Sequence, residues 1–224
     1  MSDLHRLRQM SRSDPGDAGG DGKAGASSVI FTESGRYPAD DSGYRNDYHA
    51  MQLYDADGKV VDSFPSVNPQ VSYGADVLSR IEAARDSGKA ADMQKKVLDL
   101  IEKGAQRFSK KLQEKESIQM VIAANTTMIY LLMGWDPAEL GRAPFQVSHL
   151  GAVDTQIAGI SCHIIPGLSA FVGGDITAGI LACQMLEQEE PMLLIDLGTT
   201  VRWRWVIDRS CMPVPRRPDL PSRA

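Results

Sequence analysis

Apolar residues alternate with polar ones near the start of the regular part of the chain, and this period of two predicts strands. The run MQLYDADGKVVDSF alternates on both sides of an Asp57-Gly58 pair, which is typical of a hairpin turn. We therefore expect strands at Met51–Tyr54 and Lys59–Phe64. The run SSVIF, a little earlier in the chain, is also able to start a strand.

Two later segments have the spacing of helices. Apolar residues near helical spacing predict one helix from Asp76, with Gly88 placed to close it. The clearest helix covers residues 90–117, because its apolar residues form one stripe and its charged residues lie opposite. The members of the stripe are Met93, Val97, Leu100, Ile101 and Phe108.

Strands and helices alternate in the rest of the chain. SIQMVIAAN and MLLIDL have the composition of buried strands, and GISCHIIPGL contains a further strand. TTMIYLLMG predicts an apolar helix that stops at Gly134 and Pro137, WDPAELGRAPF a short helical turn and a loop, and FVGGDITAGILAC a small-residue helix. This alternation predicts an α/β fold.

Composition narrows the class of protein. Of the 224 residues, 42% are hydrophobic and 24% charged, so most of the chain is expected to fold. A net charge of -5 argues against a nucleic-acid binder, which needs a basic face. We find no run of ~20 apolar residues and no secretory signal, and therefore expect no membrane contact. Three widely spaced cysteines (Cys162, Cys183, Cys211) argue against a disulfide framework and indicate the cytoplasm.

Candidate binding residues stand at the ends of predicted strands, where ligands gather in α/β folds. Asp196 follows a buried strand and is able to hold hydrated Mg²⁺ through a water. The turn at Gly198 and Thr199 offers backbone N–H groups and a hydroxyl to phosphate oxygens. Alternatively, these residues form an ordinary strand and turn with no ligand.

Two strand-to-helix junctions offer a second set of candidates. Gly174 and Asp175 open a predicted helix whose N-terminus would attract anions, although Asp175 could simply be the N-cap. At the other junction Asn125 could face a ligand, or Thr126 could cap the next helix. His163 beside Cys162 is a poor metal pair, because no second pair stands at ligand spacing.

Four segments occur together in an order that identifies a family. They are NPQVSYGADVLSRI (Asn68–Ile81), ANTTMIYLLMGWDPAELGRAPF (Ala124–Phe145), PGLSAFVGGDITAGILA (Pro166–Ala182) and LLIDLGT (Leu193–Thr199). The region from about residue 51 to residue 199 resembles the reductive activators of corrinoid proteins. These are iron–sulfur ATPases of the acetate and sugar kinase/Hsp70/actin superfold.

The resemblance implies a partial actin/Hsp70-like (ribonuclease H-like) ATPase fold, a mixed sheet with flanking helices. It also implies ATP-dependent reduction of a partner corrinoid protein from Co(II) to Co(I), with ATP and Mg²⁺ bound. In full-length relatives a [2Fe-2S] domain supplies the electron. Asp196, Gly198 and Thr199 match the family's second phosphate loop, Gly174 and Asp175 its glycine-aspartate turn, and Asn125 and Thr126 its asparagine-threonine-threonine turn.

The chain departs from the family in three places. No cysteine precedes Cys162, although a [2Fe-2S] cluster needs about four ligands. The segment DSGYRNDYHA stands where the first phosphate loop is expected but lacks its motif. After Thr199 the sequence differs from the family's and reads VRWRWVIDRSCMPVPRRPDLPSRA. Codons that would encode these residues can, if read one base out of phase, spell sequence that resembles the family's in both places. The hypothesis is a reading frame shifted near Thr200 and near Gly43, which the coding DNA would test.

On this hypothesis the chain is a truncated member with four parts. We expect a disordered arm at 1–28, the first (middle) lobe at 29–190, the first strand and phosphate loop of the second lobe at 191–200, and an out-of-frame tail at 201–224. MLLIDL would then be the only strand of the second lobe, and nucleotide affinity would be poor. The alternatives are a non-enzymatic interaction or homodimerisation module, and a small-molecule kinase with Asp175 as its base.

Overall fold

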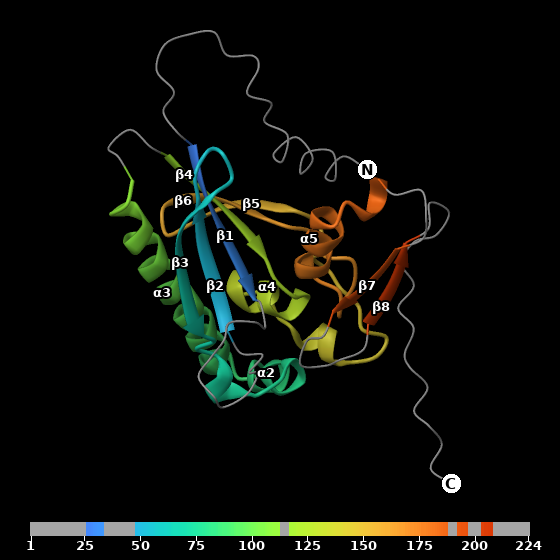
Figure 1. Ribbon diagram of the computed structural model, residues 1–224. Helices are drawn as coiled ribbons and strands as arrows, with labels where there is room; N and C mark the ends of the chain where they lie inside the picture. Colours follow the sequence, from blue (N-terminus) through green and yellow to red (C-terminus); the bar gives the residue numbers. More distant parts are fainter. Residues whose placement is uncertain (1–25, 34–47, 113–116, 188–191, 197–202, 208–224) are drawn as a thin grey trace, which may run out of the picture.

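The strands form a six-stranded mixed sheet and a two-stranded sheet in the computed structural model (Figure 1). The structure describes residues 26–33, 48–112, 117–187, 192–196 and 203–207. The strand order of the larger sheet is β3-β2-β1-β4-β6-β5. Its strands are β1 (Ala26–Glu33), β2 (Tyr48–Tyr54), β3 (Val60–Val67), β4 (Ser117–Ala123), β5 (Val153–Ile157) and β6 (Ile160–Ile164). The predicted α/β fold with a mixed sheet is confirmed.

The strand directions bring several strand ends to one edge of the larger sheet. β1, β2 and β3 form an antiparallel meander, whereas β4 runs parallel to β1 and β6 parallel to β4. β5 is the antiparallel partner of β6. Consequently β1, β4 and β6 all end on the same side, which we call the carboxyl edge. Loops and helix starts that follow these strands meet there.

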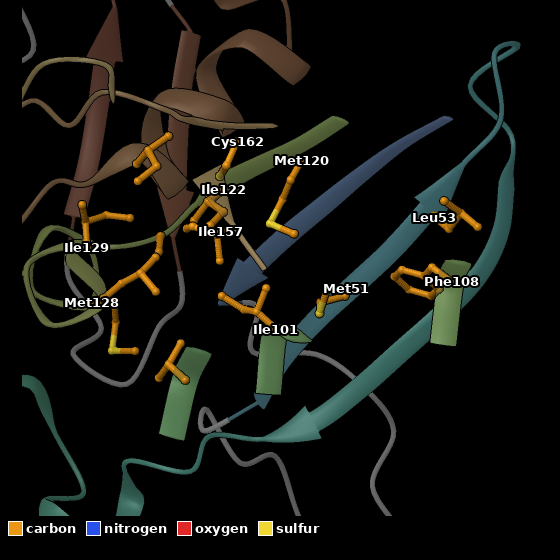
Figure 2. Packing of buried hydrophobic residues seen from close by; sticks show 14 residues of the cluster. Met51, Leu53, Ile101, Phe108, Met120, Ile122, Met128, Ile129, Ile157 and Cys162 are labelled. Atoms are coloured by element: carbon orange, nitrogen blue, oxygen red, sulfur yellow. The ribbon is translucent and has the colours of Figure 1, made fainter. Parts of the chain in front are cut away.

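Two helices form the main core with the sheet because each presents apolar residues to it. α3 (Ser87–Ser109) buries the predicted stripe, and α4 (Thr126–Met133) is buried almost all round. Figure 2 shows Met51 and Leu53 of β2 in this core together with Ile101 and Phe108 of α3. Within the described part of the chain, no helix is long and apolar enough to cross a membrane.

A second, smaller core lies around α5 (Gly174–Ala182), across the sheet from α3 (Figure 1). β7 (Met192–Asp196) packs against this helix through Met192 and Leu194. β8 (Trp203–Ile207) pairs antiparallel with β7, with Met192 opposite Ile207. The remaining elements are short: α2 (Val77–Ala83) and the 3-10 helices η1 (Val71–Tyr73), η2 (Ala138–Gly141) and η3 (Met185–Glu187).

The helix predictions need two boundary corrections. The helix expected from Asp76 ends before Gly88, which lies in the first turn of α3. The reason is that the Asp86 side chain accepts hydrogen bonds from the N–H groups of Gly88 and Lys89 and so starts a new helix. The helix expected over 90–117 ends at Ser109, and β4 already occupies the end of that range.

The structure also differs from the sequence-based expectations for strands in three places. The arm expected at 1–28 overlaps β1, because pairing with β4 begins at Ala26, opposite Ser117. β5 was not predicted, and it exists as the partner of β6. The expectation that MLLIDL is the only strand of the second lobe is wrong, since β8 pairs with it. Residues 1–25 and the rest of the tail lie outside the described residues.

Candidate functional site

α4 begins where β4 ends, and Asn125 closes its first turn. Asn125 Oδ1 accepts a hydrogen bond of 2.9 Å from the backbone N–H of Met128, so Asn125 is the N-cap. Thr126, the alternative cap in the sequence, instead donates from Oγ1 to the carbonyl oxygen of Ser169 at 2.6 Å. Both polar side chains at this junction therefore hold backbone segments in place.

α5 begins against the same junction, with Gly173 as an N-cap that has no capping side chain. A Cβ atom on Gly173 would lie 2.4 Å from both the Ala124 carbonyl oxygen and the Asn125 Cα. A Cβ atom on Gly174 would lie 2.5 Å from the Ile165 carbonyl oxygen. Atoms do not pack that closely, so both positions need glycine for the backbones to meet.

Asp175 lies in the first turn of α5 and is not its N-cap, so that alternative is wrong. Its backbone N–H donates to the Ala124 carbonyl oxygen at 3.3 Å, and its Oδ1 accepts from the N–H of Ile176 at 2.9 Å. The helix dipole favours a carboxylate at this position. The predicted site residues that the structure brings together at the carboxyl edge are Asn125, Thr126, Gly174 and Asp175.

Of the predicted second phosphate loop, the structure describes only the first residue, Asp196. Asp196 is the last residue of β7, and its backbone pairs with Trp203 of β8. Figure 1 shows β7 beside α5, and β7 ends on the side of the molecule where α4 lies. Gly198 and Thr199 lie outside the described residues, as does the DSGYRNDYHA text up to residue 47. The roles of these residues stay predictions.

A cluster around Tyr130 of α4 was not predicted from the sequence. Its hydroxyl donates to Glu139 Oε1 at 2.7 Å and accepts from the N–H groups of Ser148 and His149, each at 2.9 Å. The His149 ring stacks on Trp135 with centroids 4.1 Å apart. Burial raises the pKa of Tyr130, and the hydrogen bond from Tyr130 lowers the pKa of Glu139. These contacts hold the loop around 138–149 against α4. No local sequence pattern predicts them.

The Cys162–His163 pair on β6 has structural roles. Cys162 is buried, and this burial raises the pKa of its thiol to about 12, so the thiol stays protonated. His163 Nδ1 lies 2.7 Å from Asp154 Oδ1 on the neighbouring strand β5. Within the described ranges, no three His, Cys, Asp or Glu side chains gather as a metal site.

The strand order, with two helix starts meeting at one sheet edge, places the chain in the actin/Hsp70-like fold class. A solved structure of this class, "Reductive activator for corrinoid,iron-sulfur protein", aligns with a TM-score of 0.68 at 22% identity. The alignment covers 93% of this chain and 36% of that one. The fold expected from the sequence is therefore confirmed.

The family follows from the sequence match. Residues 49–188 match the family described as "RACo middle region", and the chain belongs to this family. It is also 31% identical over 163 residues to the corrinoid activation enzyme RamQ of Eubacterium limosum. That alignment covers 66% of this chain but 26% of RamQ, so the chain spans about a quarter of its relative's length. The resemblance to reductive activators of corrinoid proteins is confirmed.

Proposed function

We propose that this chain forms one side of the nucleotide site of an ATP-dependent activator that restores a corrinoid protein from Co(II) to Co(I). The observation that carries the proposal is the meeting of the α4 and α5 starts at the carboxyl edge, where Gly173 and Gly174 allow backbone contact. Relatives named for corrinoid activation share this region. In this proposal the protein acts on a corrinoid protein partner.

The chemistry of the residues present suits Mg²⁺ and triphosphate. Asp175 and Asp196 supply carboxylates, which are ligands that Mg²⁺ prefers. Such a carboxylate binds the ion directly or through one of its waters. Gly198 and Thr199 would bind phosphate oxygens through backbone N–H groups and a hydroxyl. Asn125 and Thr126 keep the α4 start rigid next to Asp175, whose N–H bonds to the Ala124 carbonyl oxygen. Bound Mg²⁺ would neutralise phosphate charge, and the protein residues would orient the nucleotide.

An iron–sulfur cluster does not fit the described residues. A cluster of this kind takes about four cysteine ligands, and the whole chain has three cysteines. Cys162 is buried in β6, whereas Cys183 is exposed after α5. We therefore assign the electron donor to a different protein or domain, and give this chain the nucleotide-binding part of the activation.

Calorimetry of the purified chain with Mg-ATP tests the proposal. We expect binding that disappears when Mg²⁺ is chelated. Asp175→Asn keeps the side-chain shape and its bond to the Ile176 N–H but removes the charge, so affinity should fall about tenfold. Asp99→Asn on the exposed face of α3 is the matched control and should bind as the wild type does. Absence of Mg-ATP binding by the wild-type chain would contradict the proposal.

A further inference from the structure

A groove of about 480 Å³ lies between the α2–α3 turn and the end of α4. One wall comes from the end of α2 and the first turns of α3, and includes Ala84 and Gln94. The other wall comes from the end of α4 and the residues after it, and includes Leu131 and Trp135. Sites for small organic molecules have volumes of about 300–1,000 Å³ and mostly apolar walls. The groove therefore has the size of such a site, at the end of α4 opposite to the proposed nucleotide edge.

Trp135 gives the groove a rigid aromatic wall. The His149 ring stacks on the indole with centroids 4.1 Å apart, and the buried Tyr130 ring meets it edge to face at 5.4 Å. His149 lines a separate, much smaller cavity and is not a lining residue of the groove, so the groove meets the side of the indole that His149 leaves open. A ring fixed in this way loses little conformational entropy when a ligand binds. The face of an indole also attracts cations.

The charged side chains that line the groove leave one carboxylate uncompensated. Two charged residues line it, Arg85 and Asp136. Arg85 Nη1 already lies 3.0 Å from Glu82 Oε1, so these two charges offset each other. Asp136 Oδ1 accepts a hydrogen bond of 2.9 Å from the N–H of Ala138, but no Lys, Arg or His of the described ranges forms an ion pair with this carboxylate. The groove therefore combines an indole with a carboxylate that has no positive partner in the described part of the chain.

We propose that this groove binds a small organic cation, namely an ammonium group that carries an apolar body. The Asp136 carboxylate compensates the charge, and the Trp135 indole packs against the ammonium and its alkyl groups. Ala84, Leu131 and the other apolar lining residues receive the apolar body. An anion of the same size would be repelled by the Asp136 carboxylate, and a neutral molecule would gain nothing from it. The site is separate from the proposed nucleotide edge and does not depend on that proposal.

The test is a nuclear magnetic resonance titration of the full chain with three probes of similar size and different charge: benzyltrimethylammonium, benzyl alcohol and phenylacetate. The readout is the indole N–H signal of Trp135, assigned by its loss in Trp135→Phe. We expect benzyltrimethylammonium to shift this signal with a Kd of about 1 mM, the weak affinity of a ligand of that size. Benzyl alcohol lacks the charge and should bind about tenfold more weakly. Phenylacetate that binds as tightly as benzyltrimethylammonium, or a signal that benzyltrimethylammonium does not shift, would overturn the proposal.

Two charge variants should move the affinity for benzyltrimethylammonium in opposite directions. Asp136→Asn keeps an oxygen for the Ala138 N–H but removes the negative charge, so affinity should fall about fivefold. Arg85→Gln removes a like charge from the groove and should raise affinity about twofold. Asp99→Asn is the matched control, because its carboxylate pairs with Lys95 outside the groove, and it should bind as the wild type does. Unchanged affinity in Asp136→Asn, or weaker binding in Arg85→Gln, would contradict the assignment of a cation.

Discussion

α4 and α5 start at the same edge of the sheet but are held there in different ways. The first turn of α4 is closed by a side chain, because Asn125 accepts from the Met128 N–H. The start of α5 has no side-chain cap, and Gly173 instead lies directly on the backbone of Ala124 and Asn125. One start is therefore fixed by a hydrogen bond that other residues can supply, and the other by a close approach that glycine alone permits.

This difference sets how substitutions at the two starts should behave. A cap can be replaced by a residue with a similar acceptor, and its loss leaves one N–H group without that partner. A close backbone contact has no such substitute, because an added Cβ atom pushes two elements apart. The predictions below use this contrast, and all are measured as free energies of unfolding in urea.

The largest effect is expected for Gly173→Ala. Its Cβ atom would lie 2.4 Å from backbone atoms of Ala124 and Asn125, which cannot move without shifting both helices. We expect a loss of about 3 kcal/mol in unfolding free energy. A loss below about 1 kcal/mol would show that the two starts are not in rigid contact.

Thr126→Val should have the next largest effect. The substitution keeps the shape but removes the Oγ1 hydrogen bond to Ser169, and leaves that carbonyl without this donor. We expect a loss of about 1–2 kcal/mol. Thr126→Ser retains the hydroxyl and is the control, which should recover most of the difference. Equal losses for the two variants would mean that the methyl group, and not the hydrogen bond, matters.

Asn125→Ala should cost about 1 kcal/mol, because α4 loses its N-cap. Asn125→Asp keeps an acceptor oxygen for the Met128 N–H and should stay within about 0.5 kcal/mol of the wild type. If both variants lose equal stability, the Oδ1 contact is not the feature that holds the helix start.

Gly179→Ala should have the smallest effect and the opposite sign. This glycine lies in the middle of α5, where a Cβ atom would be 3.5 Å from Leu194, an ordinary contact distance. Alanine restricts the unfolded chain and favours helix, so we expect a gain of about 0.5–1 kcal/mol. It is also the control for Gly173→Ala, since a loss here would mean that α5 resists any added side chain.

Local pattern predicted the elements whose signals are contained in one segment. The stripe from Met93 to Phe108 indicated α3, and the Asp57-Gly58 pair indicated the hairpin. Local sequence pattern did not predict the strands that form by pairing with a neighbour. β5 pairs with β6, and β8 pairs with β7. It also left open whether Thr126 and Asp175 are N-caps, and the structure gives these roles to Asn125 and Gly173 instead.

The sequence by itself determined the fold class, the family and the residues that stand at the strand ends, since these depend on periodicity and on motifs read in order. Only the tertiary structure decided that Asn125 and Thr126 have their side chains engaged in holding backbone, and that Gly173 and Gly174 serve a backbone contact. It also placed Phe145 beside Phe171. The reason is physical: apart from the local Asn125 cap, these contacts join residues far apart in the chain, and their distances exist only after the sheet has brought the helix starts together.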